Sequence, residues 1–183
     1  ELENKNFCKQ NRFRLFAPFR NIIGRVITMR ILAIDPGNIE SGYAVINMPD
    51  FEIVFFGKVS NEELKSNLYK GVFGEDDIVI EMVGCYGMPV GKDVFDTCVW
   101  IGRFAEAVGK EVHYIYRNEV KIALCGSMKA KDSNVRQALI NRYAKFDFKS
   151  GKGVKKNPDT FHGVANDMWQ AIAVGVTYHL KEI

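Results

Sequence analysis

The chain has 183 residues, 47% of them hydrophobic, with a formal net charge of +3 and four cysteines. This length and apolar content suit one α/β domain with a buried core. No apolar run approaches the roughly 20 residues that span a bilayer, and there is no signal-peptide pattern, so we expect a cytoplasmic protein without a membrane partner. The cysteines show neither a C-x-x-C motif nor metal-ligand spacing, and we expect reduced thiols.

Charge is distributed unevenly along the chain. Residues 31–116 hold 14 acidic and 6 basic side chains, whereas residues 117–156 hold 11 basic and 3 acidic ones. This split favours a polyanionic partner; a solvated lysine-rich surface is the alternative. Residues 1–28 carry six basic residues among scattered aromatics. We treat them as an extension whose role stays open between an upstream segment, a DNA-contacting arm and a cloning remnant, and we place the domain at 29–183.

The first part of the domain predicts a meander of strands at 30–35, 42–48 and 51–59, which short turns should pair antiparallel. Ser60 and Glu63 form a capping-box pattern that opens a helix through about Lys70. The pattern then predicts a strand, a helix and a fifth strand at 77–82, 93–108 and 111–116.

The second part of the domain is predominantly helical. We predict a short helical segment at 118–126 and a helix at 133–143, followed by a mobile basic loop over 146–157. A final helix is predicted at 161–181, capped by Asp159 or Thr160. The element order is that of an α/β fold with a five-stranded mixed sheet flanked by helices.

Carboxylates stand at the ends of two predicted strands. Asp35 ends the first strand, before Pro36 and Gly37, and Glu81 ends the fourth. Right-handed crossovers place the fourth strand beside the first, in parallel, so both acids meet at one edge of the sheet. If the final helix packs across that edge, Asp167 reaches them too. A lone Asp before Pro-Gly could equally cap the turn.

Three converging carboxylates repel one another, and a divalent cation resolves the repulsion. Mg²⁺ prefers oxygen ligands and keeps waters for a substrate phosphate. Two such ions roughly 4 Å apart can activate a water and stabilise the leaving oxygen in phosphodiester cleavage. The pattern therefore predicts phosphodiester hydrolysis.

The blocks IDPG…SGY, IVIEMV and ANDMWQAIA, spread over residues 29–183, resemble the RuvC family of Holliday-junction resolvases in the ribonuclease-H-like superfamily. The small size and the NDMWQA variant look most like a phage-encoded member, which would act in the host cytoplasm. The resemblance implies a ribonuclease-H-like fold and a homodimer that binds branched DNA, such as four-way junctions. It also implies cleavage of two strands of like polarity with Mg²⁺, for which Mn²⁺ substitutes.

The resemblance assigns roles to individual residues. Asp35, Glu81 and Asp167 match the family's acidic metal ligands and so are expected to be catalytic. The family's fourth ligand stands one helical turn before the last Asp, where this chain has Val164. The residues that could stand in are His162 and Asn166, with Asp159 a weaker candidate.

Basic and aromatic positions complete the resemblance. Lys121 matches a family residue close to the scissile phosphate, and we expect a catalytic role; Lys129 or Lys131 matches a second. In the family an aromatic that stacks on an unpaired base follows the second acid; here that position is Gly84, and Tyr86 is the nearest ring. We expect the basic loop to bind the DNA backbone and the helix at 93–108 to form the dimer interface; the residues concerned are Lys152, Lys155 and Lys156, and Phe95, Val99 and Trp100.

Other functions fit the sequence less well. An actin-like or sugar-kinase ATPase also opens with D-x-G on a strand, but it needs a second domain and a second glycine-rich loop. A ribonuclease acting on RNA–DNA hybrid and a catalytically inactive DNA-binding member of the fold stay as alternatives. Val164 favours the inactive member, and the intact acids favour the nuclease.

Overall fold

The computed structural model describes residues 28–85, 87 and 89–182. The predicted extension therefore lies outside the described residues except for Thr28, and Tyr86 lies outside them as well. Within the described part, no helix combines the length and the apolar character needed to cross a bilayer.

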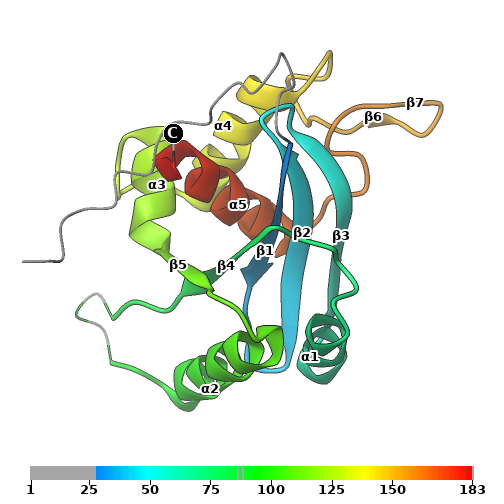
Figure 1. The fold of residues 1–183 in the computed structure, drawn as a ribbon. Helices are drawn as coiled ribbons and strands as arrows, with labels where there is room; N and C mark the ends of the chain where they lie inside the picture. Colours follow the sequence, from blue (N-terminus) through cyan, green and yellow to red (C-terminus); the bar gives the residue numbers. More distant parts are fainter. Residues whose placement is uncertain (1–27, 86, 88, 183) are drawn as a thin grey trace, which may run out of the picture.

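Five strands form one mixed sheet in the order β3-β2-β1-β4-β5 (Figure 1). The meander β1–β2–β3 is antiparallel, whereas β4 pairs with β1, and β5 with β4, in parallel. The predicted fold class is confirmed. The strand bounds are Met29–Asp35 (β1), Glu40–Met48 (β2), Glu52–Ser60 (β3), Asp77–Met82 (β4) and His113–Tyr116 (β5).

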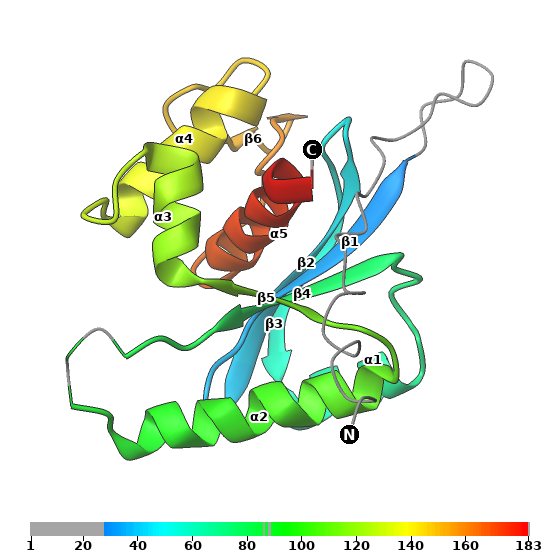
Figure 2. The ribbon, with the colours of Figure 1, turned by 60° about the vertical axis from the view of Figure 1, so that its left-hand side comes forward.

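Helices cover both faces of this sheet. Figure 2 shows α1 and α2 below the sheet and α3, α4 and α5 above it. The helix bounds are Asn61–Tyr69 (α1), Lys92–Val108 (α2), Arg117–Cys125 (α3), Asp132–Tyr143 (α4) and Met168–Glu182 (α5). Apart from the start of α5, the bounds of the five sheet strands and of the helices agree with the sequence-based prediction within two residues.

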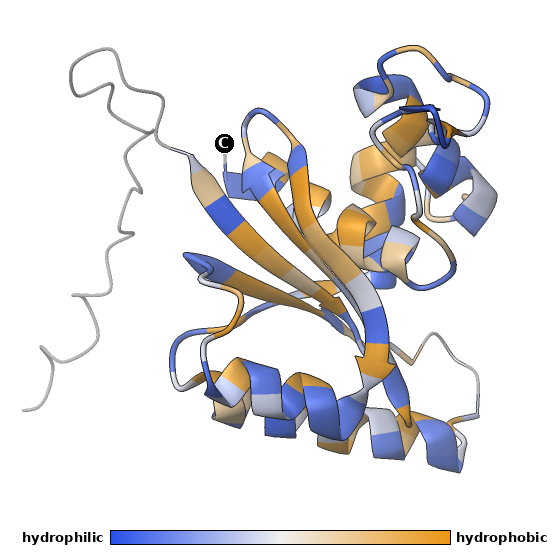
Figure 3. Ribbon diagram, turned by 90° about the vertical axis from the view of Figure 1, so that its right-hand side faces the viewer, coloured by the Kyte–Doolittle hydropathy of each residue, from blue (hydrophilic) through white to orange (hydrophobic). Residues whose placement is uncertain are grey.

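Side chains of alternating strand residues build two cores, one on each face of the sheet. Residues 31–34 of β1 are all fully buried, because α5 covers one face and α1 and α2 cover the other. The apolar strands run through the middle of the molecule in Figure 3. Each fully buried aliphatic side chain contributes about 1.5–3 kcal/mol, so these cores hold the sheet edge in place.

The final helix begins later than predicted. Helix α5 starts at Met168, and residues 160–167 form turns instead. Gly163 and Asn166 have φ values of +82° and +44°, which an α-helix does not accommodate. The carbonyl of Asp167 accepts the N–H groups of Gln170 and Ala171, so Asp167 sits at the entrance of the helix and not within it.

Asp159 does not cap that helix, contrary to the prediction. Its carboxylate accepts backbone N–H bonds from residues 145–147 and from Thr160. The side chain of Thr160 also has a different partner, because its hydroxyl donates to the carbonyl of Tyr143. Asp159 therefore joins the end of α4 to the segment before α5, and its weaker candidacy as a metal ligand stays a prediction.

The basic segment 146–157 is not an open loop. It folds back as a two-stranded hairpin, Gly153–Val154 (β6) with Asn157–Pro158 (β7). The Asp147 carboxylate accepts backbone N–H bonds from Lys149, Ser150 and Gly153 and so closes the turn before the hairpin. The lysines of this segment are carried on a defined scaffold.

Candidate functional site

A row of paired residues crosses the sheet at the carboxyl end of β1. Asp35 pairs with Gly42, and Gly42 pairs with Lys58. Strands β1 and β4 pair in parallel up to Ile34 and Ile80. The next residues, Asp35 and Glu81, therefore lie side by side. Directly paired residues point to the same face of a sheet. That face is the one that α5 covers, because the residues two positions before both acids belong to the α5 core.

The inner members of this row, Asp35 and Glu81, form a partly buried pair of neighbouring carboxyl groups, with the side chain of Glu81 13% exposed. Burial, followed by repulsion from Glu81, raises the pKa of Asp35 to about 8. Burial also raises the pKa of Glu81, against the opposing effect of Arg117. Two acids that cannot both ionise without help are an arrangement that favours a bound cation.

Arg117 links this pair to the helices beyond the sheet. It is the first residue of α3, directly after β5, and its guanidinium lies 3.4 Å from Glu81 Oε2 and 2.6 Å from Asp132 Oδ1. The sequence pattern pointed to neither Arg117 nor Asp132. The available signal was position: a basic residue that directly follows the strand next to Glu81 emerges at the same sheet edge as the acids.

Asp167 stands at the outer end of the site. Its Oδ2 lies 2.8 Å from Lys58 Nζ, and the same ammonium group lies 3.4 Å from Glu40 Oε2. The hydrogen bond to Asp167 raises the pKa of Lys58. Asp167 is close enough to Asp35 to contribute to the raised pKa of that acid. Lys58 and Glu40 were not identified from the sequence.

Gly42 allows Asp167 to approach the sheet. A Cβ atom at position 42 would lie 2.9 Å from both the carbonyl carbon and the carbonyl oxygen of Asp167. Contacts this short are not tolerated between unbonded atoms, so only glycine fits at this place in the row. The SGY motif therefore positions the third acid.

The three predicted acids are thus divided into a buried pair and a salt-bridged partner. Among the described residues, no three His, Cys, Asp or Glu side chains gather closely enough to hold one ion together. The structure brings Asp35 and Glu81 into contact and places Asp167 beside Lys58. Their role as metal ligands stays a prediction.

The residues predicted to replace the fourth ligand lie elsewhere. The Nδ1 atom of His162 is 3.0 Å from the carbonyl oxygen of Lys152, so this ring packs on the basic hairpin. Asn166 is exposed and turns the chain into α5. Val164 is fully buried in the α5 core. The side chain of Val164 has no atom that could bind a metal ion. Ligand roles for His162 and Asn166 stay predictions.

The predicted DNA-binding lysines belong to elements on the α5 face of the sheet. Lys121, one turn after Arg117 on α3, is close enough to oppose the rise in the pKa of Glu81. Lys129 and Lys131 are exposed in the connection to α4, and Lys155 and Lys156 are exposed in the turn of the β6–β7 hairpin, with Lys152 half-buried before it. Tyr86, the predicted stacking residue, lies outside the described residues.

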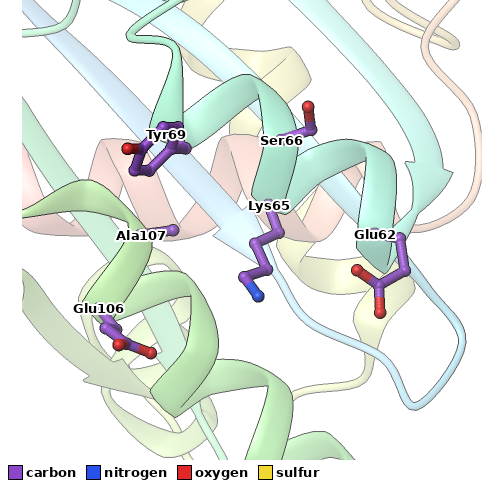
Figure 4. A pocket seen from close by; sticks show the side chains of 6 residues that line it. All are labelled: Glu62, Lys65, Ser66, Tyr69, Glu106 and Ala107. Carbon is purple, nitrogen blue, oxygen red and sulfur yellow. The ribbon is translucent and has the colours of Figure 1, made fainter.

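A groove of about 460 Å³ lies between α1 and α2 (Figure 4). Its walls carry the acids Glu62 and Glu106 and the cation Lys65. Both helices pack on the face of the sheet opposite to the carboxyl pair. The groove is therefore separate from the candidate site, and its charged residues are ordinary solvated surface.

Comparison with known proteins relates the chain to others through its fold. No protein-family model matches the sequence, and no curated protein does. The structure of T. thermophilus RuvC in complex with a Holliday junction substrate is similar at a TM-score of 0.62 and 15% identity, covering 84% of this chain and 94% of that one. A second T. thermophilus RuvC structure gives a TM-score of 0.58 and 16% identity, over 82% of this chain and 93% of that one. The chain has a RuvC-like fold.

Proposed function

We propose that this protein is a divalent-metal-dependent endonuclease that cleaves branched DNA, with four-way junctions as its substrate. The observation that carries the proposal is the partly buried pair Asp35–Glu81 at the ends of two neighbouring parallel strands, where α/β proteins place their ligand sites. The similarity to a RuvC solved with a Holliday junction supports this substrate.

The donor set fits a hard cation. Asp35 and Glu81 supply carboxylate oxygens, which are ligands that suit Mg²⁺ or Mn²⁺. Both carboxyl groups have raised pKa values, so a bound cation would remove an unfavourable charge interaction. When bound, such an ion lowers the pKa of a water and polarises the phosphate.

The side chains around the pair have separate tasks in this proposal. Arg117 holds Glu81 in place through the ion pair described above and keeps part of its charge neutralised. Lys121, on the same face of α3, provides a cation for a phosphate oxygen near the pair. Fixed cations of this kind stabilise charge that develops during phosphodiester cleavage.

DNA binding and dimerisation complete the proposal. Lys129, Lys131 and the lysines of the β6–β7 hairpin supply phosphate contacts on the α5 face. On α2, Phe95 and Val99 are 61% and 54% exposed, which suits a homodimer interface with an apolar centre. Trp100, predicted to share this interface, is half-buried, and its ring packs on Phe104 at 5.7 Å. Trp100 is partly buried against the core on the α1–α2 face of the sheet, and its place in the interface stays a prediction.

Cleavage assays with four-way, flap, duplex and RNA–DNA hybrid substrates, with and without Mg²⁺, test the proposal. We expect Mg²⁺-dependent cleavage of the four-way junction. Asp35→Asn should lower the rate by about 10³-fold or more while junction binding persists, because the acid acts on the metal and not on the DNA. Asp50→Asn, in the exposed turn after β2, is the matched control and should cleave normally.

Other results would replace this function. Preferred cleavage of the hybrid would make the protein a ribonuclease. Junction binding without any cleavage would identify a binding member of the fold. Loss of junction binding in a folded Asp35→Asn variant would make Asp35 a structural residue.

A further inference from the structure

Lys58 is the one strand residue in the row that brings a positive charge to the acids. Its ammonium group lies between Asp167 and Glu40, at 2.8 Å and 3.4 Å. The side chain is nevertheless 36% exposed, so it is accessible from solvent while it holds Asp167. An ammonium group in this position can contact a phosphate without leaving the site.

The fold places the backbones of Lys58 and Asp167 close to each other. Lys58 belongs to β3, and Gly42 of β2 lies between it and Asp35 of β1. The backbone of Asp167 fills the space above Gly42, and its carbonyl anchors the first turn of α5. The backbone positions of both residues are therefore fixed, and their side chains, which are 36% and 42% exposed, meet at 2.8 Å beside the sheet edge.

Charge and ligand supply differ between the two sides of the site. Asp35 and Glu81 form a pair whose burial favours a cation. On the other side, Asp167 already has Lys58 as its counter-ion. The position from which a further ligand was expected holds Val164, which is fully buried among apolar side chains. A second ion would have to displace Lys58 and would find no additional donor at position 164.

We propose that Lys58 supplies, on the Asp167 side, the positive charge that a second divalent ion would otherwise supply, so that each chain binds one ion. This inference rests on the proposed nuclease function and specifies its metal requirement. Lys58 would hold a phosphate oxygen and offset the charge of the transition state, a contribution that requires no proton transfer from its ammonium group.

Counting bound Mn²⁺ tests the inference. Free Mn²⁺ is measured by electron paramagnetic resonance during titration of the full chain. The wild type should bind one ion per chain, and so should Lys58→Arg, which keeps the charge. Lys58→Met should bind two, because the freed carboxylates of Asp167 and Glu40 can then hold a cation. Lys65→Met, on α1 at the opposite face, is the matched control and should bind one.

Cleavage at a Mn²⁺ concentration that fills only the first site gives the second readout. Lys58→Met should cleave the junction about 100-fold more slowly than the wild type, with junction affinity within about threefold of the wild-type value, and Lys58→Arg should retain more activity. Circular dichroism melts establish that the variants are folded; Lys58→Arg provides the test if Lys58→Met is not.

The outcomes separate this inference from the proposed function. Two ions in the wild type, or wild-type ion binding and cleavage in Lys58→Met, would overturn the role of Lys58 and leave the nuclease intact. If the ion counts are as expected but no DNA is cleaved, the role of Lys58 is supported and the proposed nuclease function is wrong. A wild type that binds no ion would overturn both.

Discussion

The site has two ends that are built differently: the inner end is the pair Asp35–Glu81, and the outer end is Asp167 with Lys58. Asp35 and Glu81 are partly buried on neighbouring strands, and loss of solvent is the largest cause of their raised pKa values. Asp167 enters from a turn, has a side chain that is 42% exposed and is paired with Lys58 at 2.8 Å. The inner end therefore lacks a full counter-charge, whereas the outer end carries its own.

This difference indicates a division of labour. A buried, under-neutralised pair attracts a cation, because burial penalises its own charge. An exposed and already neutralised acid gains less from an ion and can instead position a lysine. The pair and Asp167 can therefore be disturbed separately.

Changing Gly42 to Ala should displace Asp167 without disturbing the pair Asp35–Glu81. The added Cβ would meet the Asp167 backbone at 2.9 Å, so Asp167 must move away from Lys58 and Asp35. Displacements of this kind can cost about 100-fold in rate, and overpacking costs about 1–3 kcal/mol of stability. Binding of the first Mn²⁺ should persist. Junction cleavage and metal titration measure both effects.

The matched control is Gly91→Ala, directly before α2, where a new Cβ would have no atom within 4 Å. It should cleave normally. Normal cleavage by a folded Gly42→Ala variant would show that the close approach of Asp167 is not needed.

The stability of the metal-free protein should report on the inner end. Asp35 has a pKa of about 8 in the folded protein against 3.8 for its ordinary value. Between these values the folded state holds a proton that the unfolded chain releases, so the free energy of unfolding falls as the pH rises from about 4 to about 8. Saturating Mg²⁺ should restore stability near pH 8.

Thermal melts at about pH 5 and about pH 8, with EDTA or Mg²⁺, measure this dependence. Asp35→Asn should flatten the profile. Lys58→Met should leave it unchanged, because the pKa of Lys58 is raised above 10.5 and the group does not titrate in this range. A wild-type profile that is already flat without metal would contradict the account of the inner pair.

The basic hairpin should affect DNA affinity without affecting the chemistry. Replacing Lys152, Lys155 and Lys156 with Ala should reduce the slope of log K against log salt by about 0.9 for each lost phosphate contact, so at most about 2.7. The cleavage rate at saturating DNA should not change. Filter binding at several salt concentrations measures the slope. Lys65→Ala with Lys70→Ala, on α1, should keep the wild-type slope.

Much of the fold and the inner pair could be predicted from the sequence. Apolar runs that end in Asp35 and Glu81, joined by crossovers of fixed hand, determine that the two acids meet. The register of β1 with β4 follows from the same pattern. The positions and bounds of the strands could be predicted because burial on both faces leaves an apolar signal.

The outer end could not be predicted in the same way. Residues 161–167 carry an apolar pattern that resembles a helix, yet Gly163 and Asn166 adopt positive φ values and α5 starts only at Met168. The role of Lys58 depends on the pairing of β3 with β2 and on a Cβ missing from Gly42. These are long-range contacts, and local periodicity does not report them.

Anomalous diffraction from crystals containing Mn²⁺ tests the central claim most directly, because it locates the ion on the residues that hold it. The account predicts one Mn²⁺ peak per chain in contact with the carboxylates of Asp35 and Glu81, with Asp167 still paired to Lys58. A peak bound elsewhere, or no peak on Asp35 and Glu81 at millimolar Mn²⁺, would contradict it.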